Sequence, residues 1–121
     1  MYKLFVDLTF KAQHQLTFEN GIQEPLHEHT WKVCVAVSSE RLNNDALVID
    51  FEALKSMTEE ILQNFEGQRL ESLAIFEGRN VSAETVARTL YDQLSPKLPD
   101  TVRFDSVEIT EAPGCRARYT P

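Results

Sequence analysis

The sequence predicts an α+β fold in which a four-stranded antiparallel sheet carries two helices on one face. Apolar and polar residues alternate over 2–14, 27–37 and 115–119, a pattern that is typical of strands. Between these segments apolar residues recur at helical spacing over 51–65 and 83–94. The predicted order is β-β-α-α-β-β, with the strands grouped at both ends of the chain.

The first strand is predicted from Tyr2 to about Leu16, before the turn residues at 19–21. The residues that share a face with His14 are found by counting back in twos: Ala12, Phe10, Leu8, Val6 and Leu4. All of them are apolar. We therefore expect His14 to lie on the buried face of this strand.

The second strand is predicted from His27 to about Ser39. His27 and His29 share one face with Trp31, and their Cα atoms should lie about 6.6 Å apart. If the first two strands pair, the chain's 3 histidines can meet, and the loop between the strands would place Glu24 near them. Three neutral imidazoles are a known catalytic zinc set, in which a fourth position stays open. A histidine on an apolar face is also commonly a hydrogen-bonded core residue, so spacing alone leaves both interpretations open.

Two helices are predicted in the middle of the chain. Asp50 is a suitable N-cap for the first, which Gly67 would end. Its apolar stripe comprises Phe51, Leu54, Thr58, Ile61, Leu62 and Phe65. Ser82 would cap the second helix, and prolines at 96 and 99 would stop it.

A third strand is predicted over 101–112 and a fourth over 115–119, joined by a turn at Pro113-Gly114. The apolar parity changes within the third strand, which predicts a β-bulge near Ser106. By this count, one helix-covered face cannot hold Trp31, Val33, Val35 and the histidines together with every other apolar residue. We therefore expect a second packed surface on the sheet, such as a subunit interface.

Composition limits the classes of function. A chain of 121 residues with 42% hydrophobic and 26% charged residues fits one domain spanning 1–121. The net charge of −7 argues against a nucleic-acid partner. No apolar run reaches the roughly 18 residues of a membrane span, and the first residues resemble a strand rather than a signal peptide. We expect a cytoplasmic protein in which Cys34 and Cys115 are reduced.

Five segments, taken together, resemble a known family. They are Phe10-Lys11-Ala12-Gln13-His14, His27-Glu28-His29-Thr30-Trp31-Lys32-Val33, Val48-Ile49-Asp50-Phe51-Glu52-Ala53-Leu54-Lys55, Asn80-Val81-Ser82-Ala83-Glu84-Thr85-Val86-Ala87 and Ile109-Thr110-Glu111. In order and spacing they are similar to the family of 6-pyruvoyltetrahydropterin synthase and 6-carboxytetrahydropterin synthase. The resemblance covers nearly the whole chain.

This resemblance implies a T-fold, in which sheets from three subunits close into a barrel and active sites lie between subunits. It also implies a homo-oligomer, a trimer or a homohexamer, acting on a pterin. The family's zinc ligands correspond to His14, His27 and His29, and its pterin-anchoring glutamate corresponds to Glu111. Without the resemblance, Glu111 would be interpreted as a solvated carboxylate at a strand end. In the family, zinc binds the side-chain hydroxyls of 7,8-dihydroneopterin triphosphate, and a cysteine assisted by an Asp-His pair moves protons.

The sequence departs from the family at the proton-transferring residues. Gln23 stands where the bacterial pattern has the cysteine, and Phe65-Glu66-Gly67 stands in place of Leu-Asp-His. Cys34 is no substitute, because its parity is opposite to that of the histidines. Glu28, which stands between the two histidines of the second strand, should point to the other face.

Glu24 offers a replacement for the cysteine. Glu24-Pro25-Leu26-His27 is similar to the Glu-x-x-His of a family branch that makes 6-hydroxymethyl-7,8-dihydropterin with glutamate as the base. The first hypothesis is therefore a zinc-dependent lyase with Glu24 as catalytic residue. The second is an inactive pterin-binding protein of the same fold, and the third is a structural protein with core histidines. The candidates for phosphate binding, chosen by charge alone, are Lys11, Arg116 and Arg118.

Overall fold

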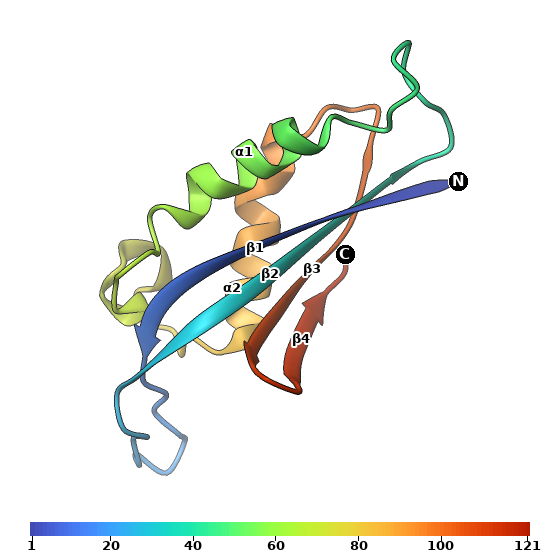
Figure 1. The fold of residues 1–121 in the computed structure, drawn as a ribbon. Coiled ribbons are helices and arrows are strands. Elements are labelled where there is room, and N and C mark those ends of the chain that lie inside the picture. The colour runs from blue at the N-terminus through green and yellow to red at the C-terminus, as the bar shows by residue number, and fades with distance from the viewer.

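The computed structural model describes residues 1–121 and has the predicted α+β architecture. Its strands are β1 (Tyr2–His14), β2 (His27–Ser39), β3 (Arg103–Ala112) and β4 (Cys115–Tyr119). They form one 4-stranded antiparallel sheet in the order β1-β2-β3-β4 (Figure 1). The helices are α1 (Phe51–Leu62) and α2 (Ala83–Leu94), and short 3-10 turns lie at Leu70–Ser72, Ala74–Phe76 and Ser95–Lys97.

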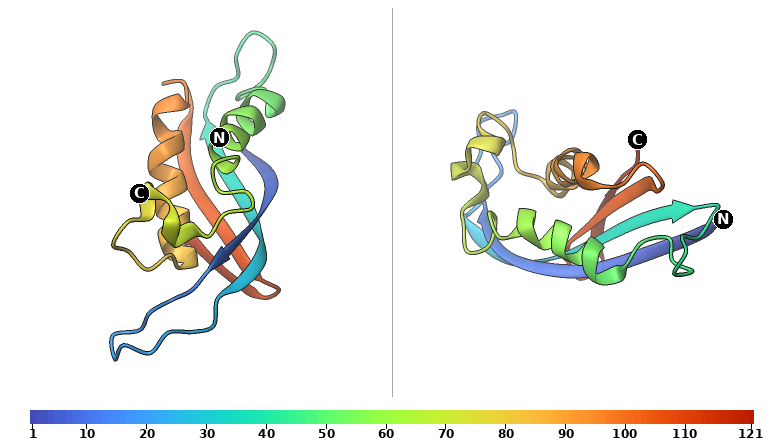
Figure 2. Two further views of the ribbon diagram at one scale, coloured as in Figure 1. Left: turned by 90° about the vertical axis from the view of Figure 1, so that its left-hand side faces the viewer. Right: turned by 90° about the horizontal axis from the view of Figure 1, so that it is seen from above.

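Both helices lie on the same side of the curved sheet (Figure 2). Helix α1 contacts β1, whereas α2 contacts β3 and β4. The premise for a second packed surface is wrong, because Trp31, Val33 and Val35 are all buried beneath this one layer. Phe65 and Phe76, which follow α1, are buried in the same cluster, so more of the chain covers this face than two helices alone. The opposite face carries mostly polar side chains, and Phe5 is exposed on it.

The predicted helix starts are confirmed. The Asp50 carboxylate accepts hydrogen bonds from the backbone N–H groups of Glu52 and Ala53, and the Ser82 hydroxyl accepts one from Thr85. Neither helix has both the length and the apolar character needed to cross a membrane.

Helix α1 ends at Leu62 rather than at Gly67. Phe65 is still buried, but Phe51 is 53% exposed, so the predicted apolar stripe is wrong at its first position. Gly67 adopts a φ of 72° and donates its N–H to the Lys11 carbonyl at 2.7 Å. The chain therefore leaves the helix early in order to reach the edge of β1.

Strand β3 contains two bulges. Ala36 pairs with Ser106 and Val37 pairs with Phe104, which leaves Asp105 as the extra residue and confirms the bulge predicted near Ser106. The second bulge was not predicted: Thr110 pairs with Arg116 and Ala112 pairs with Cys115, so Glu111 has no partner on β4. A bulge redirects side chains locally.

Candidate metal centre

The pairing of β1 with β2 brings the three histidines together. His14 lies directly opposite His27, and His29 lies opposite Ala12, at the end of the sheet that is farthest from the N-terminus. The His27 ring centroid lies 4.5 Å from that of His14 and 4.5 Å from that of His29. The meeting of the histidines that the strand parity predicts is therefore confirmed.

Hydrogen bonds to backbone carbonyls orient two of the imidazoles. Nδ1 of His14 donates to the carbonyl of Val81 at 2.7 Å, and Nδ1 of His27 donates to that of Pro25 at 2.7 Å. A neutral imidazole carries one proton, so this assignment leaves each Nε2 with a free lone pair. Metal-binding histidines in proteins are held in this way.

The two Nε2 atoms lie 2.9 Å apart. Two lone pairs this close repel each other unless a cation lies between or beside them. Ligand atoms around a tetrahedral zinc ion are separated by about 3.3 Å, which requires only a small adjustment of the two rings. The imidazoles thus fit a bound metal ion.

Burial lowers the pKa of His29, although the nearby Glu111 carboxylate acts in the opposite direction. A lowered pKa favours the neutral imidazole, which is the form that binds a metal. The Trp31 ring packs edge-on against His14 and His29, with centroids 4.8 Å and 5.6 Å away. This buried indole restricts the rotation of both imidazoles.

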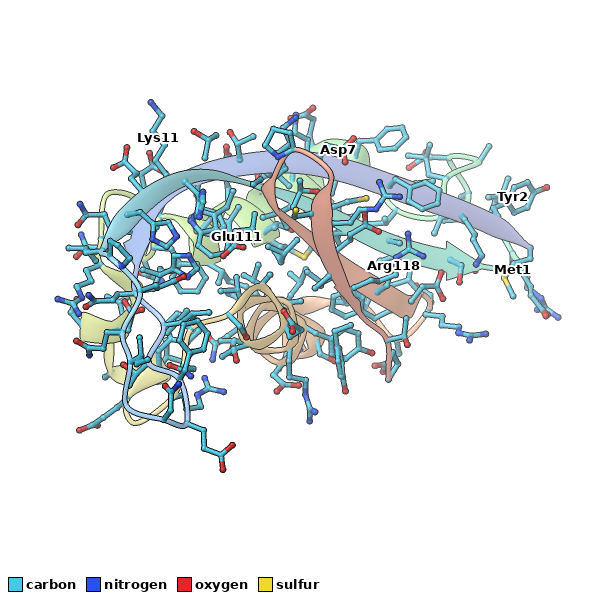
Figure 3. All side chains as sticks on the ribbon, turned by 90° about the horizontal axis from the view of Figure 1, so that it is seen from below. Met1, Tyr2, Asp7, Lys11, Glu111 and Arg118 are labelled. Carbon is cyan, nitrogen blue, oxygen red and sulfur yellow. The ribbon has the colours of Figure 1, made fainter.

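Glu111 completes a group of four potential ligands. Its Oε1 lies 2.9 Å from Nε2 of His14 and 3.9 Å from Nε2 of His29. Potential ligand atoms of Glu111 and the three histidines all lie within 4.8 Å of one another. Figure 3 shows Glu111 on the helix-covered side of the strands, whereas Lys11 points away from it. The sequence does not by itself predict that Glu111 lies this close to the histidines, but Glu111 is two residues after the buried Ile109 and so shares its strand face.

Glu24 lies beside the same group, as the sequence predicted. Its Oε1 is 3.8 Å from Nε2 of His27 and 4.0 Å from Nε2 of His14. The N–H of Leu16 donates to this oxygen at 3.0 Å, and the Gln15 side-chain amide donates to the Glu24 carbonyl at 2.8 Å. The 26% exposed side chain is therefore held in place rather than free in the loop.

The residues that depart from the family pattern lie outside the group. Gln23 is exposed and donates to Thr17. Glu66 accepts a hydrogen bond from the backbone of Lys11, which places it on the β1 edge. Cys34 pairs with Asp7 across the sheet and lies on the opposite face, as its parity predicts.

The three candidates for phosphate binding are not gathered around the histidines of this chain. Arg116 and Arg118 both form ion pairs with Glu108. Lys11 is exposed on the face opposite to the histidines, and so is Glu28, as predicted.

Comparison with known proteins gives the family. The family model for 6-pyruvoyl tetrahydropterin synthase matches residues 3–121. The chain is 26% identical over 141 residues to 6-carboxy-5,6,7,8-tetrahydropterin synthase of Haemophilus influenzae, a match covering 98% of this chain and 99% of that protein.

Solved structures share the fold. That of 6-pyruvoyl tetrahydropterin synthase from Caenorhabditis elegans is similar with a TM-score of 0.85 and 19% identity, covering 99% of this chain and 95% of that one. The enzyme from Plasmodium vivax, solved with a catalytic glutamate changed to alanine, matches with a TM-score of 0.74 and 17% identity, covering 98% and 96%. These structures show the shared fold, and the family model, which matches nearly the whole chain, shows that the chain belongs to the 6-pyruvoyl tetrahydropterin synthase family.

Proposed function

We propose that the protein is a zinc-dependent lyase that acts on 7,8-dihydroneopterin triphosphate or a less phosphorylated form. The observation that carries the proposal is the convergence of His14, His27 and His29 on one point with the Glu24 carboxylate beside it. A metal site with a neighbouring base is the arrangement that proton abstraction from a bound hydroxyl requires.

In this proposal the three imidazoles hold the zinc ion. The carbonyls of Val81 and Pro25 keep the Nε2 atoms of His14 and His27 directed toward it. Bound zinc would act as a Lewis acid that lowers the pKa of the substrate's side-chain hydroxyls.

Glu24 acts as the general base. Leu16 fixes Oε1 by a hydrogen bond, so the carboxylate keeps a defined distance from the imidazoles. It would accept the proton of the 2′-hydroxyl while the bond between C1′ and C2′ breaks. C2′ leaves as an aldehyde, and C1′ takes up a proton to give 6-hydroxymethyl-7,8-dihydropterin. The catalytic glutamate of the Plasmodium vivax protein supports the use of this residue type on the same fold.

Glu111 anchors the pterin ring. A carboxylate can accept two parallel hydrogen bonds from the 2-amino group and the adjacent ring N–H. Its side chain lies beside the histidines and is 29% exposed, so a pterin ring could reach this carboxylate at the candidate metal site.

The test is to incubate zinc-loaded protein with 7,8-dihydroneopterin triphosphate and with its dephosphorylated form and to identify products by mass. Glu24→Gln should abolish turnover and leave zinc bound. Glu28→Gln is the matched control, because Glu28 stands between His27 and His29 in the sequence but lies on the other face. Undiminished turnover by Glu24→Gln would remove Glu24 from the mechanism.

A second candidate function is pterin binding without chemistry. It is favoured by Gln23 and Gly67, which stand where the family's cysteine and histidine are expected and carry no group that could transfer a proton. Pterin bound tightly by zinc-loaded protein, with no product after long incubation, would select this candidate over the lyase.

A further inference from the structure

Glu111 is the carboxylate nearest to the metal-facing nitrogens. Its Oε1 lies 2.9 Å from Nε2 of His14, whereas Oε1 of Glu24 lies 4.0 Å from the same atom. The Glu24 oxygen also accepts the N–H of Leu16. The polar contacts of the Glu111 carboxylate are those with His14 and His29.

The backbone directs Glu111 toward the histidines. Ile109 pairs with Val33 on β2, and Glu111 follows two residues later on the same face, toward Trp31 and His29. The bulge at Glu111 removes it from the ladder with β4. Its approach to His14 therefore follows from the strand register and from an extra residue in β3.

We propose that Glu111 is the fourth ligand of the metal ion in the substrate-free protein, and that it leaves the ion when a pterin binds. Three imidazoles leave one position of a tetrahedral site, and the Glu111 oxygen is the protein atom placed to take it. The pterin part of this inference rests on the function proposed above, whereas the coordination part depends only on the geometry.

The two roles of Glu111 exclude each other. Anchoring a pterin by paired hydrogen bonds uses both carboxylate oxygens, so the carboxylate must turn away from the ion. By linkage, pterin binding and coordination by Glu111 oppose each other, and the fourth position opens only when the ring is bound. The arrangement would keep the metal site closed to other small ligands in the absence of substrate.

The coordination part is tested with Co²⁺, whose visible spectrum reports its ligands. Apo-protein would be loaded with Co²⁺, and its affinity would be measured by competition with a chelator. Glu111→Gln should weaken Co²⁺ binding on the order of tenfold or more and alter the spectrum. Glu24→Gln, the matched control, should change the affinity by less than about threefold, because its oxygen is not a ligand. Equal urea midpoints of the metal-free proteins would show that both variants fold.

Access to the fourth position is tested with azide, a small anionic ligand. Wild-type Co²⁺ protein should bind azide weakly, and Glu111→Gln should bind it about tenfold more tightly because the position is open. Pterin itself, which lacks the side-chain hydroxyls, should tighten azide binding to the wild type.

Wild-type affinities for Co²⁺ and azide in Glu111→Gln would overturn the proposed coordination. Azide binding that is indifferent to pterin would overturn the exchange. None of these measurements requires turnover, so their failure is distinguishable from failure of the proposed lyase activity, which the Glu24→Gln assay tests.

Discussion

At the residue scale, Cys34 shows how the polar face of the sheet controls reactivity. Burial raises the pKa of the Cys34 thiol to about 11, and the negative charge of Asp7, its hydrogen bond to the thiol and the charge of Glu108 act in the same direction. The thiolate is the reactive form of cysteine. With a pKa of about 11, about one Cys34 side chain in a thousand is ionised at pH 8.

We expect iodoacetamide to modify the exposed Cys115 at pH 8 while leaving most of Cys34 intact. In Cys115→Ser protein the labelling rate of Cys34 should rise about tenfold per pH unit between pH 8 and 10, because the fraction of Cys34 that is thiolate rises by the same factor. Asp7→Asn should lower the pKa of the Cys34 thiol and accelerate the labelling of Cys34 at pH 8. Mass spectrometry of the modified protein measures both rates, and equal labelling of the two cysteines would contradict the prediction.

At the scale of elements, the two helix caps differ in how close they lie to the candidate metal centre. Asp50 caps α1 at the other end of the fold, beyond the short loop that follows β2. Ser82 caps α2 and directly follows Val81, whose carbonyl holds the His14 imidazole. The start of α2 is therefore a structural support of the site, and the start of α1 is not.

Removal of either cap should cost about 1 kcal/mol of the free energy of unfolding, because backbone N–H groups lose their acceptor. We expect Asp50→Ala and Ser82→Ala to show similar losses in urea denaturation. Only Ser82→Ala should also weaken zinc binding in a chelator competition, because it loosens the segment that orients His14. Equal zinc affinities in both variants would argue that Val81 is held independently of the cap.

At the scale of the whole molecule, the sheet has two edges, β1 and β4. The loop after α1 covers one end of the β1 edge, where Lys11 and Gln13 donate their N–H groups to Glu66 and Gln68. Because these groups alternate in direction along a strand, the N–H of Phe5 also points outward, away from β2. Exposed strand edges favour pairing with another chain. We therefore propose that the protein assembles as a homo-oligomer, a trimer or a hexamer.

We expect the wild-type protein to have a mass of three or six copies of the 13.8 kDa chain by light scattering. Phe5→Pro should reduce the assembly, because proline removes an outward-facing donor without breaking the pairing of β1 with β2. Phe5→Ala keeps that donor and should assemble like the wild type. Assembly of Phe5→Pro at the wild-type mass would show that this part of the edge is not an interface.

Much of the candidate metal centre could be predicted from residue spacing. The parity of His14, His27 and His29 placed all three on the apolar faces of two strands, since strand side chains alternate with a period of two. The helix caps Asp50 and Ser82 and the bulge near Ser106 were also predictable, because each depends on only a few neighbouring residues. The resemblance implied a pterin-anchoring role for Glu111, which stays a proposal, but not its distance from the histidines.

The contacts between residues that lie far apart in the chain were decided by the tertiary structure alone. The carbonyl of Val81 reaches His14 because α2 packs against β3 and β4, which no local pattern reveals. The bulge at Glu111 depends on how β3 pairs with β4, and the burial of Trp31 beneath one layer depends on the segment that follows α1. Alternation along a strand is a property of the backbone and can be read from the sequence, whereas register and docking depend on packing between segments far apart in the chain.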